Sequence, residues 1–133
     1  MPSPAEEVLA ANRRLLDAVA AADWKTYQSL VADDITCFEP EAKGQLVEGL
    51  PFHKFYFDLA AEKPKGASHV TTTLASPVVK MLGSEVAVVC YVRLVQKLDA
   101  SGSPVVSSGE ETRVWVRMAS GWKHVHFHRS VPG

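Results

Sequence analysis

Residues 85 to 98 read EVAVVCYVRLVQKL, a run in which nearly every residue favours an extended β conformation. Three other segments share this character: 68–82, 107–118 and 122–130. Turn-forming residues separate neighbouring segments, at Gly83-Ser84, at Asp99 to Pro104 and at Ser120-Gly121. Four strands joined by short turns predict an antiparallel meander in the C-terminal half of the chain.

The residues at the start of the chain have helical spacing instead. Between Pro4 and about Ala22, apolar residues recur at the interval of a helix turn, among charged ones. Ser3 is a candidate N-cap for this helix. Asp23 can cap a second, shorter helix that ends near Asp33-Asp34.

A hairpin and a third helix connect these helices to the meander. Ile35 to Phe38 reads as a strand that is broken at Pro40, and Gln45 to Glu48 reads as a short return strand. Pro51 opens a third helix, and the segment from Lys63 to Gly66 ends it. The order of elements predicts an α+β fold with the helices on one face of a curved sheet. Such a sheet often leaves a pocket at one end.

The composition indicates one globular domain over residues 1–133. The chain is 47% hydrophobic, and its formal net charge of -1 provides no general field that would attract nucleic acid. No stretch approaches the roughly 18 to 20 apolar residues of a membrane span. Cys37 and Cys90 lie far apart in apolar runs, and no signal peptide is apparent, so we expect buried thiols. We therefore expect a soluble, cytoplasmic protein that binds neither nucleic acid nor membrane.

Three arginines on the predicted strands are candidates for one shared site. A turn centred on Ser103 would place Arg93 opposite Arg113, because partners in an antiparallel pair have numbers that sum to a constant. A three-residue loop at the next turn leaves Arg129 on the same face, whereas a two-residue loop would substitute His128.

Three converging guanidinium groups repel one another unless carboxylates or a bound anion lie between them. Glu39, Glu41 and Glu111 are candidate partners. Two interpretations stay open at this point. Each arginine is a solvated or ion-paired strand residue, or together they form a receptor for a carboxylate or phosphate, which planar arginine binds through two hydrogen bonds.

Alternating histidines on the last strand suggest a metal site as a further possibility. His124, His126 and His128 share one face if the strand is regular. A metal would need a further ligand, and only His53 and His69 are available, at distances that the sequence does not define. We expect a packed or hydrogen-bonded histidine face, and neither a metal nor a cofactor.

A small enzyme is the alternative from another functional class. The chain contains no GxSxG, P-loop, GxGxxG or HExxH motif. Isomerases and cyclases of small α+β folds place an Asp or Glu base in a pocket, and Glu39, Glu41 or Glu48 could serve. We expect no catalytic residues, with a polyketide cyclase or isomerase-like enzyme as the competing hypothesis.

Five segments of the sequence are distinctive in combination: TCFEPEAKGQLVEG (36–49), FHKFYF (52–57), YVRLVQ (91–96), EETRVWVR (110–117) and VHFHRS (125–130). Together they closely resemble the association, or hub, domain of calcium/calmodulin-dependent protein kinase II. The resemblance implies a nuclear transport factor 2-like cone, in which a long helix packs against a strongly bent antiparallel sheet. It also implies assembly into a two-layered ring of roughly ten to twenty subunits, with an organising and not a catalytic role.

The same resemblance implies a ligand site. The family's pocket is lined by three arginines, and the matching positions are Arg93, Arg113 and Arg129. A histidine and a tyrosine at its mouth match His53 and Tyr27, and the pocket accepts small carboxylates. The chain begins just before the hub's first helix, so we expect neither a kinase domain nor the family's calmodulin-binding segment.

Overall fold

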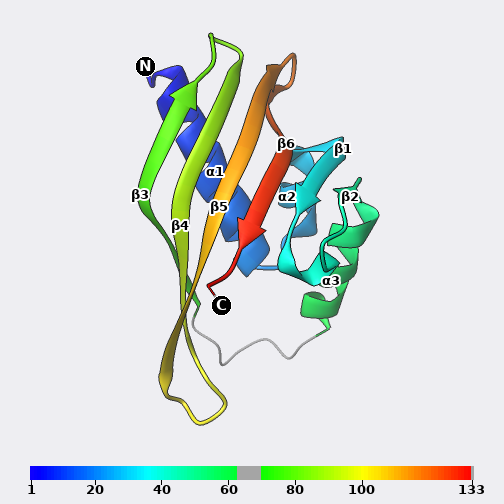
Figure 1. Ribbon diagram of the computed structural model, residues 1–133, viewed down its shortest axis with the longest axis vertical. Coiled ribbons are helices and arrows are strands. Elements are labelled where there is room, and N and C mark those ends of the chain that lie inside the picture. The colour runs from blue at the N-terminus through cyan, green and yellow to red at the C-terminus, as the bar shows by residue number, and fades with distance from the viewer. Residues whose placement is uncertain (63–69, 133) are drawn as a thin grey trace.

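A six-stranded sheet packs one of its faces against three helices (Figure 1). The computed structural model describes residues 1–62 and 70–132. The helical elements are α1 (Pro4–Ala20), α2 (Trp24–Leu30), the short 3-10 helix η1 (Pro40–Ala42) and α3 (Pro51–Ala61). The strands are β1 (Val31–Phe38), β2 (Val47–Glu48), β3 (Thr71–Met81), β4 (Val86–Leu98), β5 (Pro104–Met118) and β6 (Gly121–Ser130). The predicted α+β class is confirmed.

Helix α1 begins as the sequence predicts. The Ser3 side chain accepts a hydrogen bond from the Glu6 backbone N–H, and the Glu6 side chain accepts one from the Ser3 N–H, which forms a capping box. The apolar stripe of α1 is buried on the inner face of the sheet, against β3 and β4. Burial of this stripe holds the helix against the sheet, and Figure 1 shows α1 running behind the strands.

Helix α2 is shorter than predicted. Asp23 caps it through a hydrogen bond from the Thr26 N–H, but the helix ends at Leu30 instead of near Asp33-Asp34. Val31 already belongs to β1, where it pairs with His124 of β6. Pairing with a distant strand has therefore overridden the local helical tendency of this segment.

The predicted hairpin is present and extends the sheet. Strand β2 pairs antiparallel with β1, so that Thr36 lies opposite Glu48. Strand β1 also pairs with β6, and this pairing is parallel, which gives the strand order β2-β1-β6-β5-β4-β3. The sequence did not predict the parallel pair. The predicted terminator of α3, residues 63–66, and His69 lie outside the described residues.

The register between β4 and β5 differs from the prediction. Arg93 lies opposite Gly109, and Arg113 lies opposite Val89, so the predicted pairing of the two arginines is wrong. The turn is centred nearer to residue 101 because the Asp99 carboxylate accepts hydrogen bonds from the backbone N–H groups of Ser101 and Ser103. The register shift is an even number of residues, so both arginines keep the same face of the sheet.

A β-bulge sets the face that Arg129 occupies. The turn between β5 and β6 contains two residues, since Met118 pairs with Gly121, and a regular ladder would then turn His128 inward, as predicted for a loop of this length. The register shifts at Val125, however, and beyond it Arg129 lies opposite Glu111. The extra residue restores the inward direction of Arg129.

The same bulge separates the histidines of β6. His124 pairs with Trp115 on the inner face and is fully buried. His126 and His128 lie on the opposite, outer face, where they contact the ring of Phe38. The prediction that all three histidines share one face is therefore wrong, because a single inserted residue reverses the alternation of a strand.

The core lies between the inner face of the sheet and the helices. Its largest fully buried side chains are Trp115, Leu15, Leu16, Ile35, His124, Val8, Val89, Asn12 and Cys37. Figure 1 shows the outer face of the sheet without a helix over it in the described part of the chain. No described helix is long and apolar enough to cross a membrane.

Candidate functional site

A cavity of about 270 Å³ opens between the inner face of the sheet and helices α2 and α3. All five residues that the resemblance implies for a ligand site line it: Tyr27, His53, Arg93, Arg113 and Arg129. Two carboxylates, Glu39 and Glu41, also line it. The fold therefore brings together residues that are up to about a hundred positions apart in the sequence.

Arg113 is the most buried of the three arginines. Its Nη2 donates to Glu111 Oε1 at 2.8 Å, and its Nε donates to the Tyr91 hydroxyl at 2.9 Å. The guanidinium lies over the Phe127 ring, with Cζ 4.4 Å from the centroid. Burial lowers the pKa of Arg113, but the Glu111 charge outweighs it and raises the pKa above its ordinary value. Arg113 is therefore a permanently charged and rigidly held cation.

Glu111 joins two of the arginines. In addition to Arg113 it accepts a hydrogen bond from Arg93 Nη1 at 3.2 Å and one from the Tyr91 hydroxyl at 2.5 Å. Burial by itself raises the pKa of the carboxyl, but the charges of Arg113 and Arg93 and the hydrogen bonds together lower it to about 2. Glu111 is thus ionised at neutral pH, and it is engaged with Arg113, Arg93 and Tyr91.

Arg129 is held differently. Its Nη2 forms a close ion pair with the Glu41 carboxylate, whose side chain is 40% exposed. A second carboxylate, Glu39, lies 4.0 Å from Nε of Arg129, farther than a hydrogen bond. Arg129 is therefore paired with a carboxylate at the surface, which solvent can replace at little cost.

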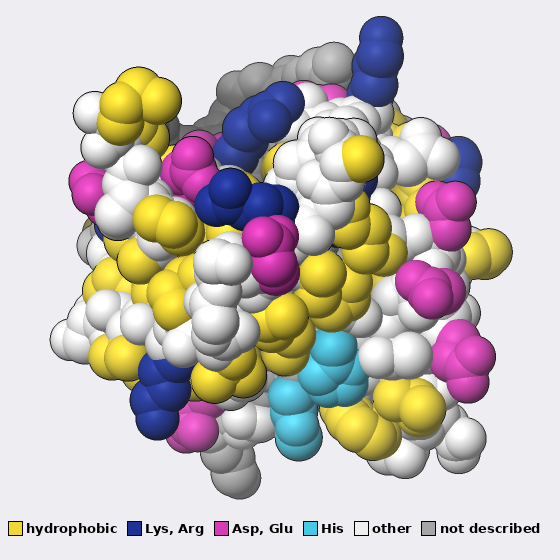
Figure 2. Space-filling view, turned by 90° about the horizontal axis from the view of Figure 1, so that it is seen from above, with side chains coloured by type: hydrophobic (Ala, Val, Ile, Leu, Met, Phe, Trp, Pro, Cys, Tyr) yellow, Lys and Arg dark blue, Asp and Glu magenta, His cyan; other side chains and the backbone are white. Residues whose placement is uncertain are grey.

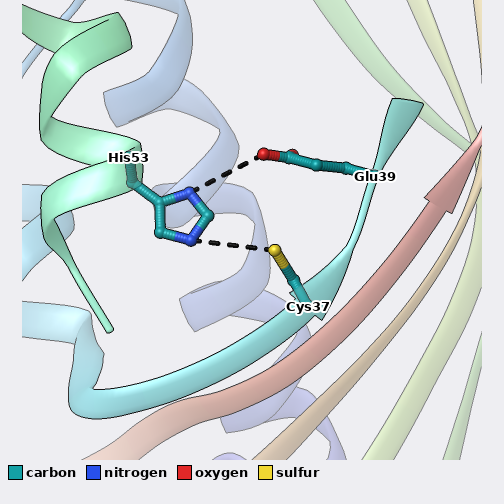
Figure 3. A group of neighbouring side chains, drawn as sticks. All are labelled: Cys37, Glu39 and His53. Atoms are coloured by element: carbon teal, nitrogen blue, oxygen red, sulfur yellow. Dashed lines mark hydrogen bonds and ion pairs between the residues drawn. The ribbon is translucent and has the colours of Figure 1, made fainter. Parts of the chain in front are cut away.

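His53 lies between a carboxylate and a thiol. As Figure 3 shows, its Nδ1 faces Glu39 Oε1 at 4.0 Å, and its Nε2 faces Cys37 Sγ at 3.8 Å. Burial, with a contribution from Arg113, lowers the pKa of His53 to about 4. Burial also raises the pKa of the Cys37 thiol to about 12 and raises the pKa of Glu39. At neutral pH the imidazole and the thiol are both uncharged.

Tyr27 packs within an aromatic cluster at the side of the cavity. Its ring lies 4.7 Å from that of Phe57 and 6.1 Å from that of His53, measured between centroids. Trp24 stacks on Tyr27 with 5.6 Å between centroids and also contacts Phe57, at 5.2 Å. These contacts fix the orientation of the Tyr27 ring.

Sequence reasoning missed a buried polar network behind the arginines. Asn12 of α1 donates from Nδ2 to the Tyr91 hydroxyl at 3.0 Å and accepts from Trp115 Nε1 at 3.0 Å. Tyr91 in turn contacts Glu111 and Arg113. Asn12 interrupts the apolar stripe of α1, and a polar residue in such a position was the signal that could have revealed it.

His124 completes this network on the inner side. Its Nε2 lies 3.4 Å from Arg113 Nη1, and its ring stacks on Phe127 with 5.4 Å between centroids. Burial and the adjacent Arg113 lower the pKa of His124 far below its usual range, so the ring is neutral. His124 thus supports Arg113 and takes no part in a histidine face on β6.

The charges in and around the cavity balance. The three predicted carboxylate partners, Glu39, Glu41 and Glu111, all lie close to the arginines. An anion that binds here must therefore compete with a carboxylate, and Glu41 is the most exposed of the three. Glu48, a candidate base in the enzyme hypothesis, is exposed on β2 and is absent from the lining of this cavity.

Comparison with known proteins places the chain in a family. Residues 4–133 match the family model for the calcium/calmodulin dependent protein kinase II association domain. The chain is 41% identical over 125 residues to the calcium/calmodulin-dependent protein kinase type II subunit delta of Oryctolagus cuniculus. This alignment covers 94% of the chain but only 23% of that relative, so the chain spans less than a quarter of the relative's length.

Solved structures agree with this assignment. The Chlamydamonas reinhardtii CamKII hub homology domain aligns with a TM-score of 0.92 and 50% identity, over 98% of this chain and 100% of that one. A nuclear transport factor 2-like protein from Salmonella enterica aligns with a TM-score of 0.75 over 98% of this chain and 92% of its own. At 23% identity the second likeness shows the fold alone, and it confirms the predicted nuclear transport factor 2-like cone. The chain belongs to the calcium/calmodulin dependent protein kinase II association domain family.

Proposed function

We propose that this chain is a self-assembling hub domain that forms a two-layered ring and has an organising role without catalysis. Membership of an association domain family is the observation that carries the proposal. The ring would contain roughly ten to twenty copies arranged with closed symmetry. A cytoplasmic location is part of the proposal, and the free thiols of Cys37 and Cys90 suit a reducing compartment.

The surface supports association with further copies. Large apolar side chains are exposed on the outer face of the sheet, among them Val92 at 39%, Val78 at 51% and Phe38 at 39%. Broad areas of hydrophobic side chains also reach the surface between charged groups when the molecule is seen from above (Figure 2). Exposed apolar surface of this kind favours burial against another protein molecule.

Size-exclusion chromatography with light scattering tests the assembly. At low micromolar concentration we expect a particle mass of roughly ten to twenty times the chain mass. A monomer or a simple dimer at that concentration contradicts the ring. Class averages from negative-stain electron microscopy would then distinguish a two-layered ring from an open filament of similar mass.

We further propose that the cavity binds a small carboxylate through Arg93, Arg113 and Arg129. Arg113 offers a fixed cation, because its guanidinium group donates hydrogen bonds to Glu111 and Tyr91 and lies over the Phe127 ring. Arg129 offers an exchangeable one, since its Glu41 partner is exposed enough to swing into water when a ligand carboxylate replaces it.

Titration calorimetry with a series of short mono- and dicarboxylates tests this site, with the corresponding amides as matched controls. We expect binding of the acids and none of the amides, because only a carboxylate can replace the charge of Glu41. Arg129→Ala should weaken binding at least about tenfold, the usual effect of losing one charge-assisted hydrogen bond. Equal binding of acids and amides, or unchanged affinity in Arg129→Ala, contradicts the proposal.

A further inference from the structure

The cluster of Cys37, Glu39 and His53 combines a sulfur, an oxygen and a nitrogen ligand at the inner wall of the cavity. One ligand atom from each residue can be chosen so that all of them lie within 4.8 Å of one another. Figure 3 shows the three side chains converging from two elements, with the imidazole between the thiol and the carboxylate. We infer that this cluster binds a zinc ion.

Local structure explains why these side chains meet. Cys37 and Glu39 are two positions apart at the end of β1, so the alternation of an extended chain directs both toward the interior. His53 projects from the first turn of α3, and both His53 and Phe57 of this helix pack against Tyr27 of α2. The ligands thus come from a strand and a helix of the folded core, which is more rigid support than a loop would offer.

The spacing suits zinc with a small adjustment. In a tetrahedral site with bonds of about 2.0 to 2.3 Å, neighbouring ligand atoms lie roughly 3.3 to 3.8 Å apart. Cys37 Sγ and His53 Nε2 already meet this at 3.8 Å. Glu39 Oε1 faces the other ring nitrogen, Nδ1, at 4.0 Å, so a change of the Glu39 rotamer would have to bring the carboxylate to the Nε2 side of the ring. Thiolate, imidazole and carboxylate together are a ligand set that zinc accepts and that magnesium and calcium do not favour.

Among the described residues, the close ion pairs around the cavity involve carboxylates other than Glu39. Glu111 accepts hydrogen bonds from both Arg113 and Arg93, and Glu41 pairs with Arg129. Glu39, with a side chain only 10% exposed, has the neutral His53 imidazole and the Arg129 guanidinium at 4.0 Å, beyond hydrogen-bond distance. A divalent cation held by a thiolate and a carboxylate would give a neutral centre and would provide this buried carboxylate with a close partner.

The same connectivity, acid to imidazole to thiol, also occurs in cysteine nucleophiles. Cys37 is fully buried beneath the cavity and is not among the residues that line it, whereas Glu39 and His53 are. Sγ is therefore covered from the cavity, which disfavours attack on a substrate, whereas an ion bound between the three side chains needs no exposed sulfur. Three protein ligands leave a fourth position, on the cavity side, for water or another small ligand.

Cobalt substitution tests the site in the assembled protein. The chelator-treated, reduced protein is titrated with Co²⁺ without oxygen, followed by Zn²⁺. We expect a near-ultraviolet thiolate-to-Co²⁺ charge-transfer band that saturates at one ion per chain and disappears when Zn²⁺ displaces Co²⁺. Cys37→Ser should abolish the band, while Cys90→Ser, which removes the only other thiol, should retain it.

If Cys37→Ser does not fold, Glu39→Gln tests the zinc site instead. Residue 39 lies at the edge of the core, so we expect this variant to fold. This variant should keep the band but weaken Co²⁺ binding at least about tenfold, as loss of a metal-supporting carboxylate does. The inference is overturned if the folded natural sequence gives no band, if the band persists in Cys37→Ser or is lost in Cys90→Ser, or if Glu39→Gln binds with unchanged affinity. None of these results depends on ring assembly or on the arginines, so they separate this inference from the proposed function.

Discussion

Glu111 and Arg113 form a buried ion pair within a single strand, with 2.8 Å between Oε1 and Nη2. Replacing the carboxylate leaves a buried guanidinium without its counter-charge, which costs far more than losing a surface pair. We expect Glu111→Gln to lower the free energy of unfolding by about 3 to 5 kcal/mol. Urea denaturation at a fixed protein concentration measures the loss. Glu110→Gln, at the exposed neighbouring position on the outer face, should change it by less than about 0.5 kcal/mol.

The pKa of Glu111 gives the protein a specific acid sensitivity. Its folded-state pKa of about 2 lies below the ordinary value of 4.5, so the ionised form stabilises the folded state. This stabilisation is complete above about pH 4.5 and is lost as the pH falls from there toward 2. The difference corresponds to on the order of 3 kcal/mol.

Thermal or urea unfolding between pH 6 and pH 2.5 measures this dependence. Glu111→Gln cannot titrate at this position, so its stability should fall less steeply over the same range. Parallel curves for the natural sequence and the variant would show that the acid sensitivity comes from other groups.

Asn12 connects α1 to the arginine cluster through Tyr91 and Trp115. Asn12→Ala would leave the buried Trp115 N–H without its acceptor and the Tyr91 hydroxyl without one of its partners. We expect a loss of about 2 to 4 kcal/mol in the free energy of unfolding. Arg13→Ala, at the exposed next position of the same helix, is the matched control and should have little effect. An equal loss in both variants would indicate a general effect on α1 and not this network.

Glu41 competes with a ligand for Arg129 if the cavity binds carboxylates. Glu41→Gln removes this internal competitor, so carboxylate affinity should increase about tenfold, the opposite of the change expected for Arg129→Ala. Calorimetric titration of both variants with the same acid measures the two shifts. Glu62→Gln, an exposed carboxylate at the end of α3, controls for the general effect of one fewer negative charge. A decrease in affinity in Glu41→Gln would mean that Glu41 supports the ligand and does not compete with it.

The sequence predicted the types of element and predicted that the three arginines share one face of the sheet. The second prediction rested on an incorrect strand register. The predicted register between β4 and β5 was wrong by an even number of residues, and only for this reason did Arg93 and Arg113 keep the predicted face of the sheet. At the β5–β6 turn, the effect of the two-residue loop was reversed by the bulge at Val125. The position of a bulge depends on how the whole sheet curves against its core. The residues around Val125 contain no local sequence pattern that predicts a bulge there.

Other features of the site could not be predicted for a similar reason. The parallel pairing of β1 with β6 joins residues about ninety positions apart, and it is this pairing that brings Cys37 and Glu39 close to the meander. Hydrophobic periodicity and turn residues depend on positions close together in the sequence, whereas the pairing of β1 with β6 depends on the topology of the packed fold. The sequence predicted that carboxylates would accompany the arginines. Which arginine is paired with Glu111, Glu41 or Glu39 became clear only from the positions of these side chains in the structure.

The outer face of the sheet offers the sharpest test of assembly through this surface. Val92 is 39% exposed there, on the strand that lies between β3 and β5, and glutamate at this position would place a charge in any interface formed by the face. We expect Val92→Glu to reduce the particle mass in light scattering by severalfold while circular dichroism stays unchanged. Leu59→Glu, which puts the same charge on an exposed apolar position of α3, is the matched control and should preserve the mass. A full-sized particle from Val92→Glu would show that the copies meet elsewhere, and dissociation of both variants would show that the effect is one of charge and not of position.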